Sequence, residues 1–124
     1  MSSKVLVIDD NEFFVDMLSC FLQTLGYEVN VSTNSREGLK KSLQFQPDLI
    51  VMDIIMPDMD GYDLLRELKQ QENKAKVIAV SGGGLLDKFE YLKTAELLGA
   101  DCALSKPFKS LQAFGSKVNE LMVA

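Results

Sequence analysis

The chain has 124 residues, of which 47% are hydrophobic and 25% charged, and its formal net charge is −5. This composition is typical of one globular domain over residues 1–124, and an acidic chain without a basic block is not expected to bind nucleic acid directly. The sequence has no histidine, which excludes Ser-His-Asp and Cys-His catalysis and histidine-ligated zinc.

Five short apolar runs predict five strands. Most of them are almost continuously apolar, as expected for parallel strands that are covered on both faces. The second run alternates apolar and polar residues, which favours a strand at the edge of the sheet. In chain order, the predicted strands are residues 4–8, 27–32, 48–53, 76–81 and 102–104.

A helical pattern follows each predicted strand. Asn11, Asn34 and Asp60 stand where N-caps of the first three helices are expected. The second helix has the weakest pattern, because it contains Gly38 and a largely polar face. The apolar positions of the five predicted helices lie within residues 14–25, 39–43, 64–68, 89–98 and 111–122.

The regular alternation of strands and helices implies parallel βαβ units with right-handed crossovers. The most apolar strands are expected at the centre and the alternating second strand at an edge. The predicted fold is therefore α/β, a doubly wound, flavodoxin-like, five-stranded parallel sheet in the order 2-1-3-4-5 with helices on both faces.

The cysteines and the hydropathy of the chain indicate its cellular compartment. Cys20 and Cys102 fall inside apolar patterns and are predicted to be buried free thiols of a reducing compartment. No secretory segment follows Met1, and no apolar run is long enough to span a bilayer. A cytoplasmic location without membrane insertion is expected.

Polar residues follow the predicted strands at their carboxyl ends, where open α/β sheets bind ligands. Asp9, Asp10 and Asp53 would crowd three carboxylates together, and a divalent cation such as Mg²⁺ would relieve their repulsion. Ser81 can donate a hydrogen bond, and Lys106 supplies a positive charge. This set predicts a pocket for a phosphoryl group, with Asp53 able to act as the nucleophile.

Each of these residues also has a simpler interpretation on its own. A lone Asp9 or Asp10 is more often a helix N-cap, and a lone Lys-Pro is usually a surface turn. Gly82-Gly83-Gly84 lacks the spacing of a dinucleotide-binding loop and is interpreted as a connector. Only the coincidence of five polar residues at one edge of the sheet favours the phosphoryl site.

The ordered motifs resemble the receiver domain of two-component response regulators, over the whole chain. The motifs are Asp9-Asp10, the segment 53–61 with Pro57 and Gly61, Ser81, and Lys106-Pro107-Phe108. The resemblance implies phosphorylation of Asp53 by a histidine kinase or a histidine phosphotransfer protein, followed by contact with a downstream target protein. It implies a signalling protein rather than an enzyme, and a cis Lys106-Pro107 bond.

The same resemblance implies the ligands of a Mg²⁺ ion. Asp10, Asp53 and the main-chain carbonyl of Ile55 would bind the metal directly, and Asp9 would bind it through water. Ser81 would donate a hydrogen bond to the phosphoryl group, and Lys106 would form an ion pair with it.

Two departures from the family pattern bear on signalling. Ala103 stands where many receivers have an aromatic switch residue, and Phe89 and Tyr91 on the fourth helix are candidates to replace it. Our hypothesis is that signalling works through the Gly-rich loop and the fourth helix alone. Ile55 and Gly83 stand where polar side chains orient water in receivers that dephosphorylate quickly, which predicts a long-lived phosphoryl group.

Three functional interpretations remain open at this point. The leading one is a stand-alone receiver, since no effector domain follows Ala124, with its output surface on the fourth helix, fifth strand and fifth helix. The second is a Mg²⁺-dependent phosphohydrolase, although Ile55 occupies the place of its usual second acid. The third is a degenerate receiver that binds partners without phosphorylation.

Overall fold

The computed structural model of the chain describes residues 3–56, 59–71, 75–82, 88–106 and 108–123, apart from the side chains at positions 88, 89 and 91. The roles predicted for Pro57, Gly83, Phe89, Tyr91 and Pro107 therefore fall outside the described residues. Within the described ranges, no helix combines the length and apolar character needed to cross a membrane.

One parallel sheet forms the centre of the molecule. Its order is β2-β1-β3-β4-β5, and every pair of neighbouring strands is parallel, as the sequence predicts. The partly exposed β2 lies at one edge, and the fully buried β3 lies at the centre. The strands are β1 (Lys4–Ile8), β2 (Glu28–Ser32), β3 (Leu49–Asp53), β4 (Lys76–Ser81) and β5 (Cys102–Ser105).

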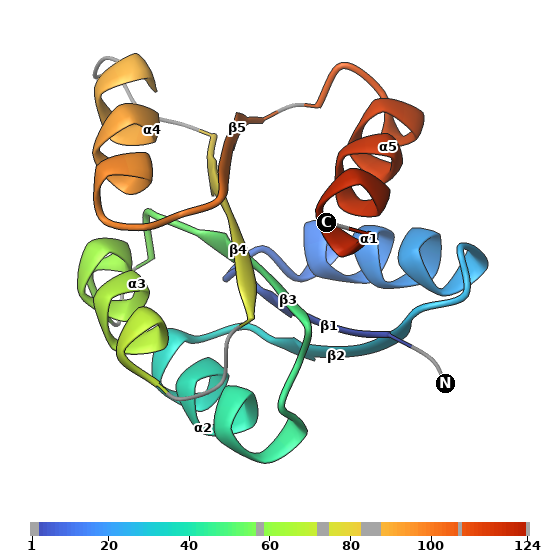
Figure 1. Cartoon of the computed structure of the whole chain (residues 1–124), viewed down its shortest axis with the longest axis horizontal. Helices are drawn as coiled ribbons and strands as arrows, with labels where there is room; N and C mark the ends of the chain where they lie inside the picture. Colours follow the sequence, from blue (N-terminus) through green and yellow to red (C-terminus); the bar gives the residue numbers. More distant parts are fainter. Residues whose placement is uncertain (1–2, 57–58, 72–74, 83–87, 107, 124) are drawn as a thin grey trace.

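Five helices cover the two faces of the sheet (Figure 1). α1 and α5 pack on one face, and α2, α3 and α4 pack on the other. The predicted caps Asn11, Asn34 and Asp60 each accept a hydrogen bond from a main-chain N–H of the first helical turn, as N-caps do. The helices are α1 (Glu12–Thr24), α2 (Ser35–Phe45), α3 (Gly61–Gln70), α4 (Lys88–Leu97) and α5 (Leu111–Met122).

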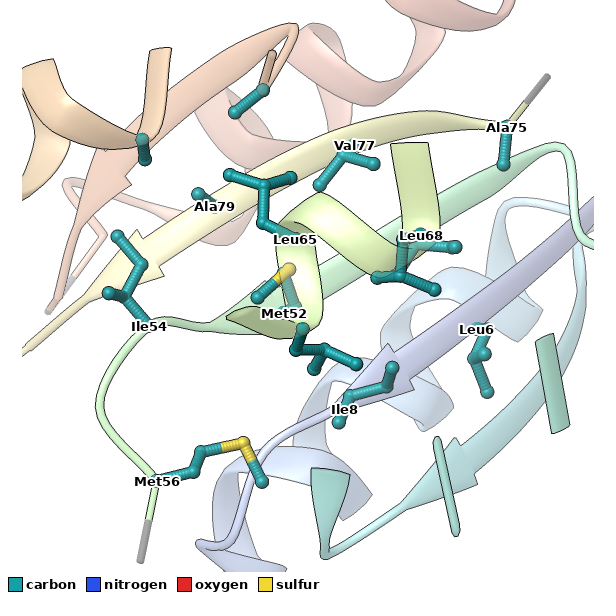
Figure 2. Packing of buried hydrophobic residues seen from close by; sticks show 14 residues of the cluster. Leu6, Ile8, Met52, Ile54, Met56, Leu65, Leu68, Ala75, Val77 and Ala79 are labelled. Atoms are coloured by element: carbon teal, nitrogen blue, oxygen red, sulfur yellow. The ribbon is translucent and has the colours of Figure 1, made fainter. Parts of the chain in front are cut away.

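The alternation of side chains along each strand divides the core into two layers. On β1, Leu6 and Ile8 face the α2–α3–α4 side, whereas Val5 and Val7 face the α1–α5 side. On the first of these sides, the leucines of α3 pack over β1, β3 and β4 (Figure 2). This two-sided burial explains why β1 and β3 each contain four consecutive apolar residues, at positions 5–8 and 49–52.

The expectation that Cys20 is buried is wrong. Cys20 is exposed, because α1 packs through Val15, Leu18 and Leu22, and position 20 lies off that stripe. Leu43 on α2 is 57% exposed, because that helix buries small residues against the sheet instead. Cys102 is partly buried, and both thiols are free.

The connection from β3 to α3 folds tightly back on the end of β3. The N–H of Gly61 donates to the carbonyl of Ile54 at 3.0 Å, and the N–H of Ile54 donates to Val80 at 3.0 Å. A Cβ atom at position 61 would lie 2.0 Å from the Ile54 carbonyl oxygen. Only glycine permits this approach, which fixes the backbone next to Asp53.

Candidate functional site

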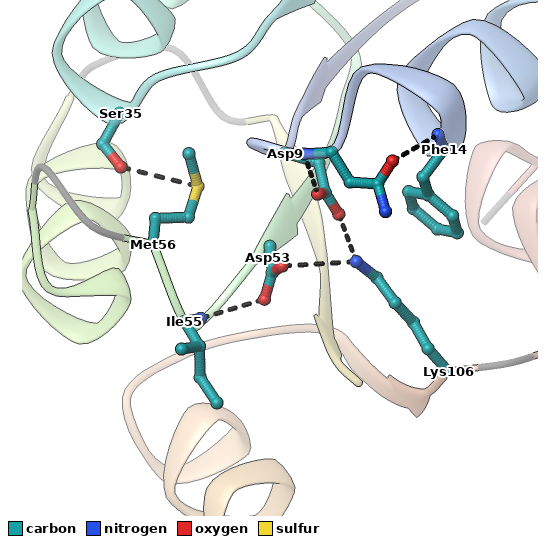
Figure 3. Close-up of polar contacts among 8 residues, drawn as sticks. Asp9, Phe14, Ser35, Asp53, Ile55, Met56 and Lys106 are labelled. Carbon is teal, nitrogen blue, oxygen red and sulfur yellow. Dashed lines mark hydrogen bonds and ion pairs between the residues drawn. The ribbon is translucent and has the colours of Figure 1, made fainter. Parts of the chain in front are cut away.

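Side chains from three strand ends meet at the carboxyl edge of the sheet (Figure 3). Asp9 follows β1, Asp53 ends β3 and Lys106 follows β5. The main chain of Lys106 is anchored to β4, because its N–H donates to the Ser81 carbonyl at 3.0 Å. Hydrogen bonding between the parallel strands therefore fixes the backbone positions from which these side chains extend.

Lys106 joins the two buried carboxylates. Its Nζ lies 2.6 Å from Asp9 Oδ2 and 3.2 Å from Asp53 Oδ2, within hydrogen-bond and ion-pair range. Asp9 is only 1% exposed and Asp53 7% exposed. Buried charges of this kind need a partner, and one ammonium serves both.

Main-chain N–H groups hold the other carboxylate oxygens. Asp9 Oδ1 accepts a hydrogen bond from the N–H of Asn11 at 2.9 Å, and Asp53 Oδ1 accepts one from the N–H of Ile55 at 2.9 Å. Each carboxylate is thus fixed between a main-chain donor and Lys106. Asp10, in contrast, is exposed.

The surroundings raise the pKa of both Asp53 and Lys106, but for different reasons. Burial raises the pKa of Asp53 above its usual value, and the nearby Asp9 charge raises it further. The hydrogen bond from Ile55 and the Lys106 charge only partly offset these effects. Burial alone would lower the pKa of Lys106, but the hydrogen bonds and charges of Asp9 and Asp53 raise it overall. Lys106 therefore stays charged at neutral pH.

Because the pKa of Asp53 is raised by folding, the stability of the protein should depend on pH. Folding favours the protonated carboxyl, so this stabilisation is present at low pH and is lost as the pH rises from the unfolded to the folded pKa. Without divalent cations, Asp53→Asn should therefore unfold at higher urea concentration than the unsubstituted protein, by a margin that grows over this pH range. Urea unfolding at several pH values measures it; a constant margin would contradict the prediction.

The acidic residues have the composition of a hard-cation site. One carboxylate oxygen from each of Asp9, Asp10 and Asp53 can be chosen so that all three lie within 4.8 Å of one another. A pocket of about 350 Å³ opens beside them and is lined by Asp10, Asn11, Asp53, Ile55, Gly82 and Lys106. Mg²⁺ prefers such oxygen ligands and keeps part of its water shell. The residues present thus fit the predicted ion.

The main chain of Ser81 binds Lys106, but its side chain makes no hydrogen bond to the other site residues. It ends β4 with no exposed surface, and its Oγ has no hydrogen-bond partner among the residues that the structure describes. A buried hydroxyl without a partner costs free energy, which is tolerated where the group has another use.

The Ser81→Ala substitution should affect the rate of phosphorylation but not the stability of the fold. The Ser81 hydroxyl makes no hydrogen bond to any residue that the structure describes, so its removal should leave the free energy of unfolding unchanged or slightly raise it. If that hydroxyl donates to a phosphoryl group during transfer, the substitution should slow phosphorylation on the order of 10²-fold. Urea unfolding and the rate of phosphorylation by acetyl phosphate test the two parts. A stability loss with an unchanged rate would contradict both.

Sequence reasoning did not identify Phe14 as part of this site. Its ring centroid lies 4.2 Å from Lys106 Nζ, although its spacing indicated only the apolar face of a helix. An aromatic residue at helical spacing is normally a core residue, so no signal in the sequence distinguished it. The contact depends on how α1 and the segment after β5 pack together.

Comparisons with known proteins agree on one family. Residues 5–115 match the family model described as the response regulator receiver domain. The chain is 39% identical over 85 residues to the chemotaxis protein CheY of Thermotoga maritima, covering 68% of this chain and 71% of CheY. Among solved structures, the receiver domain of the Francisella response regulator 1452 has a TM-score of 0.86 and 31% identity, covering 98% of this chain and 97% of that chain.

A longer relative is the alkaline phosphatase synthesis transcriptional regulatory protein PhoP of Bacillus subtilis. The identity is 35% over 108 residues, which cover 87% of this chain and 44% of PhoP. The chain thus spans less than half the length of that regulator.

Proposed function

Because this chain belongs to the response regulator receiver family of two-component signalling, we propose that Asp53 is its phosphoacceptor. The proposal rests on the burial and the hydrogen-bond partners of the Asp53 carboxylate. It is buried at the end of β3, held by the Ile55 N–H and paired with Lys106. Such a group is oriented before the phosphodonor arrives, which lowers the entropic cost of transfer.

In the proposed transfer, an Asp53 carboxylate oxygen attacks the phosphorus of a phosphohistidine on a histidine kinase or a histidine phosphotransfer protein. A P–O bond forms while the P–N bond breaks, and the electron pair of the broken bond stays on the imidazole nitrogen. Lys106, already 3.2 Å from Asp53 Oδ2, is placed to neutralise charge on the phosphoryl oxygens. Ser81 is proposed to donate its free hydroxyl to one of them.

We further propose that Asp9, Asp10, Asp53 and the main-chain carbonyl of Ile55 hold Mg²⁺. When bound, the ion would neutralise negative charge on the transferred group. The support is the cluster of three carboxylates, which Lys106 alone neutralises only in part. Asp10 is the exposed member of the cluster and so the most accessible to an entering ion.

The phosphoryl group on Asp53 should be long-lived. The side chain two residues after Asp53 is Ile55, which is 44% exposed and cannot orient a water molecule for hydrolysis. Loss of the adduct after removal of the donor should take minutes or longer, as intact-mass spectrometry can follow. Ile55→Asn should shorten this lifetime, whereas a lifetime of seconds in the unsubstituted protein would contradict the prediction.

The direct test is intact-mass spectrometry after incubation with Mg²⁺ and acetyl phosphate. One stoichiometric phosphoryl adduct, absent when Mg²⁺ is chelated, is the expected result. Turnover of a generic phosphate ester without an adduct would instead favour the phosphohydrolase. Failure of both phosphorylation and beryllofluoride binding would favour a degenerate receiver.

The remaining proposals concern partners and location. We propose a cytoplasmic signalling protein whose output is contact of α4, β5 and α5 with a downstream target protein. Ala103 on β5 is partly buried on this surface. Its small side chain supports a switch that relies on the segment between β4 and α4, most of which lies outside the described residues.

A further inference from the structure

The charged end of Lys106 has a third neighbour besides its two carboxylates. The ring of Phe14 stands beside it, with its centroid 4.2 Å from Nζ (Figure 3). This distance is well inside the range of cation–π contacts, in which the electron-rich ring face attracts a positive charge. The ammonium is thus enclosed by Asp9, Asp53 and an aromatic ring.

The position of the ring is fixed from the hydrophobic core. Phe14 packs on Phe108 at 5.7 Å between centroids, and Phe108 stacks on Phe114 at 4.6 Å with nearly parallel planes. Phe114 lies on α5 and is only 2% exposed. At the other end, the N–H of Phe14 donates to the capping side chain of Asn11 at 3.1 Å. The three rings connect the buried face of α5 to Lys106.

A ring supplies something that an aliphatic side chain at position 14 would not. Leucine or methionine would fill the same space but would not attract an ammonium. A third carboxylate would attract it, but would also repel an incoming phosphoryl group. A ring face attracts the ammonium without a directional hydrogen bond, so Nζ can shift from Asp53 to a phosphoryl oxygen and keep this contact.

We propose that Phe14 is a positioning residue for Lys106 during phosphoryl transfer to Asp53, an inference that rests on the proposed function above. It holds the ammonium beside the phosphoacceptor. Its loss should slow the transfer step itself and should leave the binding of Mg²⁺ to the carboxylates unchanged.

The test compares three variants of the full chain with the unsubstituted protein. Phe14→Leu removes the ring, Phe14→Tyr keeps it, and Phe13→Leu is the matched control, since Phe13 is adjacent on α1 but 80% exposed. Phosphorylation rates over a range of acetyl phosphate concentrations, at saturating Mg²⁺, separate the maximal rate constant from the half-saturating concentration. Phe14→Leu should lower the maximal rate constant about 5-fold, with Phe14→Tyr within about 2-fold of the unsubstituted protein. Phe13→Leu should not change it.

A spectroscopic measurement reports the contact independently of activity. The ring current of Phe14 should shift the ε-methylene protons of Lys106 upfield in proton–carbon NMR spectra. Phe14→Tyr should retain this shift and Phe14→Leu should lose it, while the urea midpoints confirm that all variants are folded.

The outcomes separate this role from the proposed function. If the unsubstituted protein takes no phosphoryl group, the proposed function fails and the role of Phe14 fails with it. If it does, but Phe14→Leu reacts as fast as Phe13→Leu, only the role of Phe14 is overturned. Equal slowing by Phe14→Leu and Phe14→Tyr, or a loss of Mg²⁺ affinity that accounts for the slower rate, would also overturn it.

Discussion

Asp53→Asn should abolish the phosphoryl adduct that acetyl phosphate and Mg²⁺ produce on the unsubstituted protein. An amide oxygen is a poor nucleophile and cannot form a stable acyl phosphate, although Asn has nearly the same shape as Asp. The amide oxygen can still accept one of the two hydrogen bonds, from the N–H of Ile55 or from the ammonium of Lys106, and the side chain fills the same space, so the fold should be retained. Intact-mass spectrometry measures the adduct directly.

The matched control is Asp16→Asn, which removes an exposed carboxylate on α1 outside the acidic cluster. This variant should be phosphorylated as fast and as completely as the unsubstituted protein. An adduct that persists in Asp53→Asn at unchanged stoichiometry would show that another residue accepts the phosphoryl group. Loss of the adduct in both variants would point to an effect of net charge instead.

Gly61→Ala should lower the free energy of unfolding by about 3 kcal/mol, since a clash with main chain cannot be relieved by a side-chain rotation. The added Cβ would lie 2.0 Å from the Ile54 carbonyl oxygen, so the tight connection after β3 must open. The hydrogen bond from Gly61 to Ile54 would be disturbed as well. Urea or thermal unfolding gives the loss of stability.

Gly26→Ala provides the control, because it separates steric contact from backbone conformation. Position 26 has a φ of 94°, but among the described residues, apart from its two neighbours in the chain, no atom lies within 4 Å of its added Cβ. Only the left-handed conformation should then cost free energy, about 1 kcal/mol. A larger loss at Gly26 than at Gly61 would contradict the account of the β3–α3 connection.

Much of the fold could be predicted because local patterns and topology agree with each other. Residues 5–8 and 49–52 are apolar at every position, as expected for strands buried on both faces, and the structure places both strands in the interior of the sheet. The N-caps Asn11 and Asn34 were visible from their position before a helical pattern. Once the strand order is known, the carboxyl ends of the strands must share one edge.

What could not be predicted depends on packing between distant segments. Nothing in the sequence shows that Lys106 bridges Asp9 and Asp53, because the bridge requires the Lys106 side chain to reach from the end of β5 to carboxylates at the ends of β1 and β3. The exposure of Leu43 had the same origin, since α2 approaches the sheet through small residues. The aromatic contact of Phe14 likewise forms only when α1 and α5 pack on the same face.

The most direct test of the central claim is to map the phosphorylated residue. Borohydride reduction of an aspartyl phosphate gives homoserine, which tandem mass spectrometry of peptides can locate. After incubation with Mg²⁺ and acetyl phosphate, we predict homoserine at position 53 and unmodified aspartates at positions 9 and 10. Homoserine at either of those positions, or a phosphoryl group on a residue other than Asp53, would contradict the account.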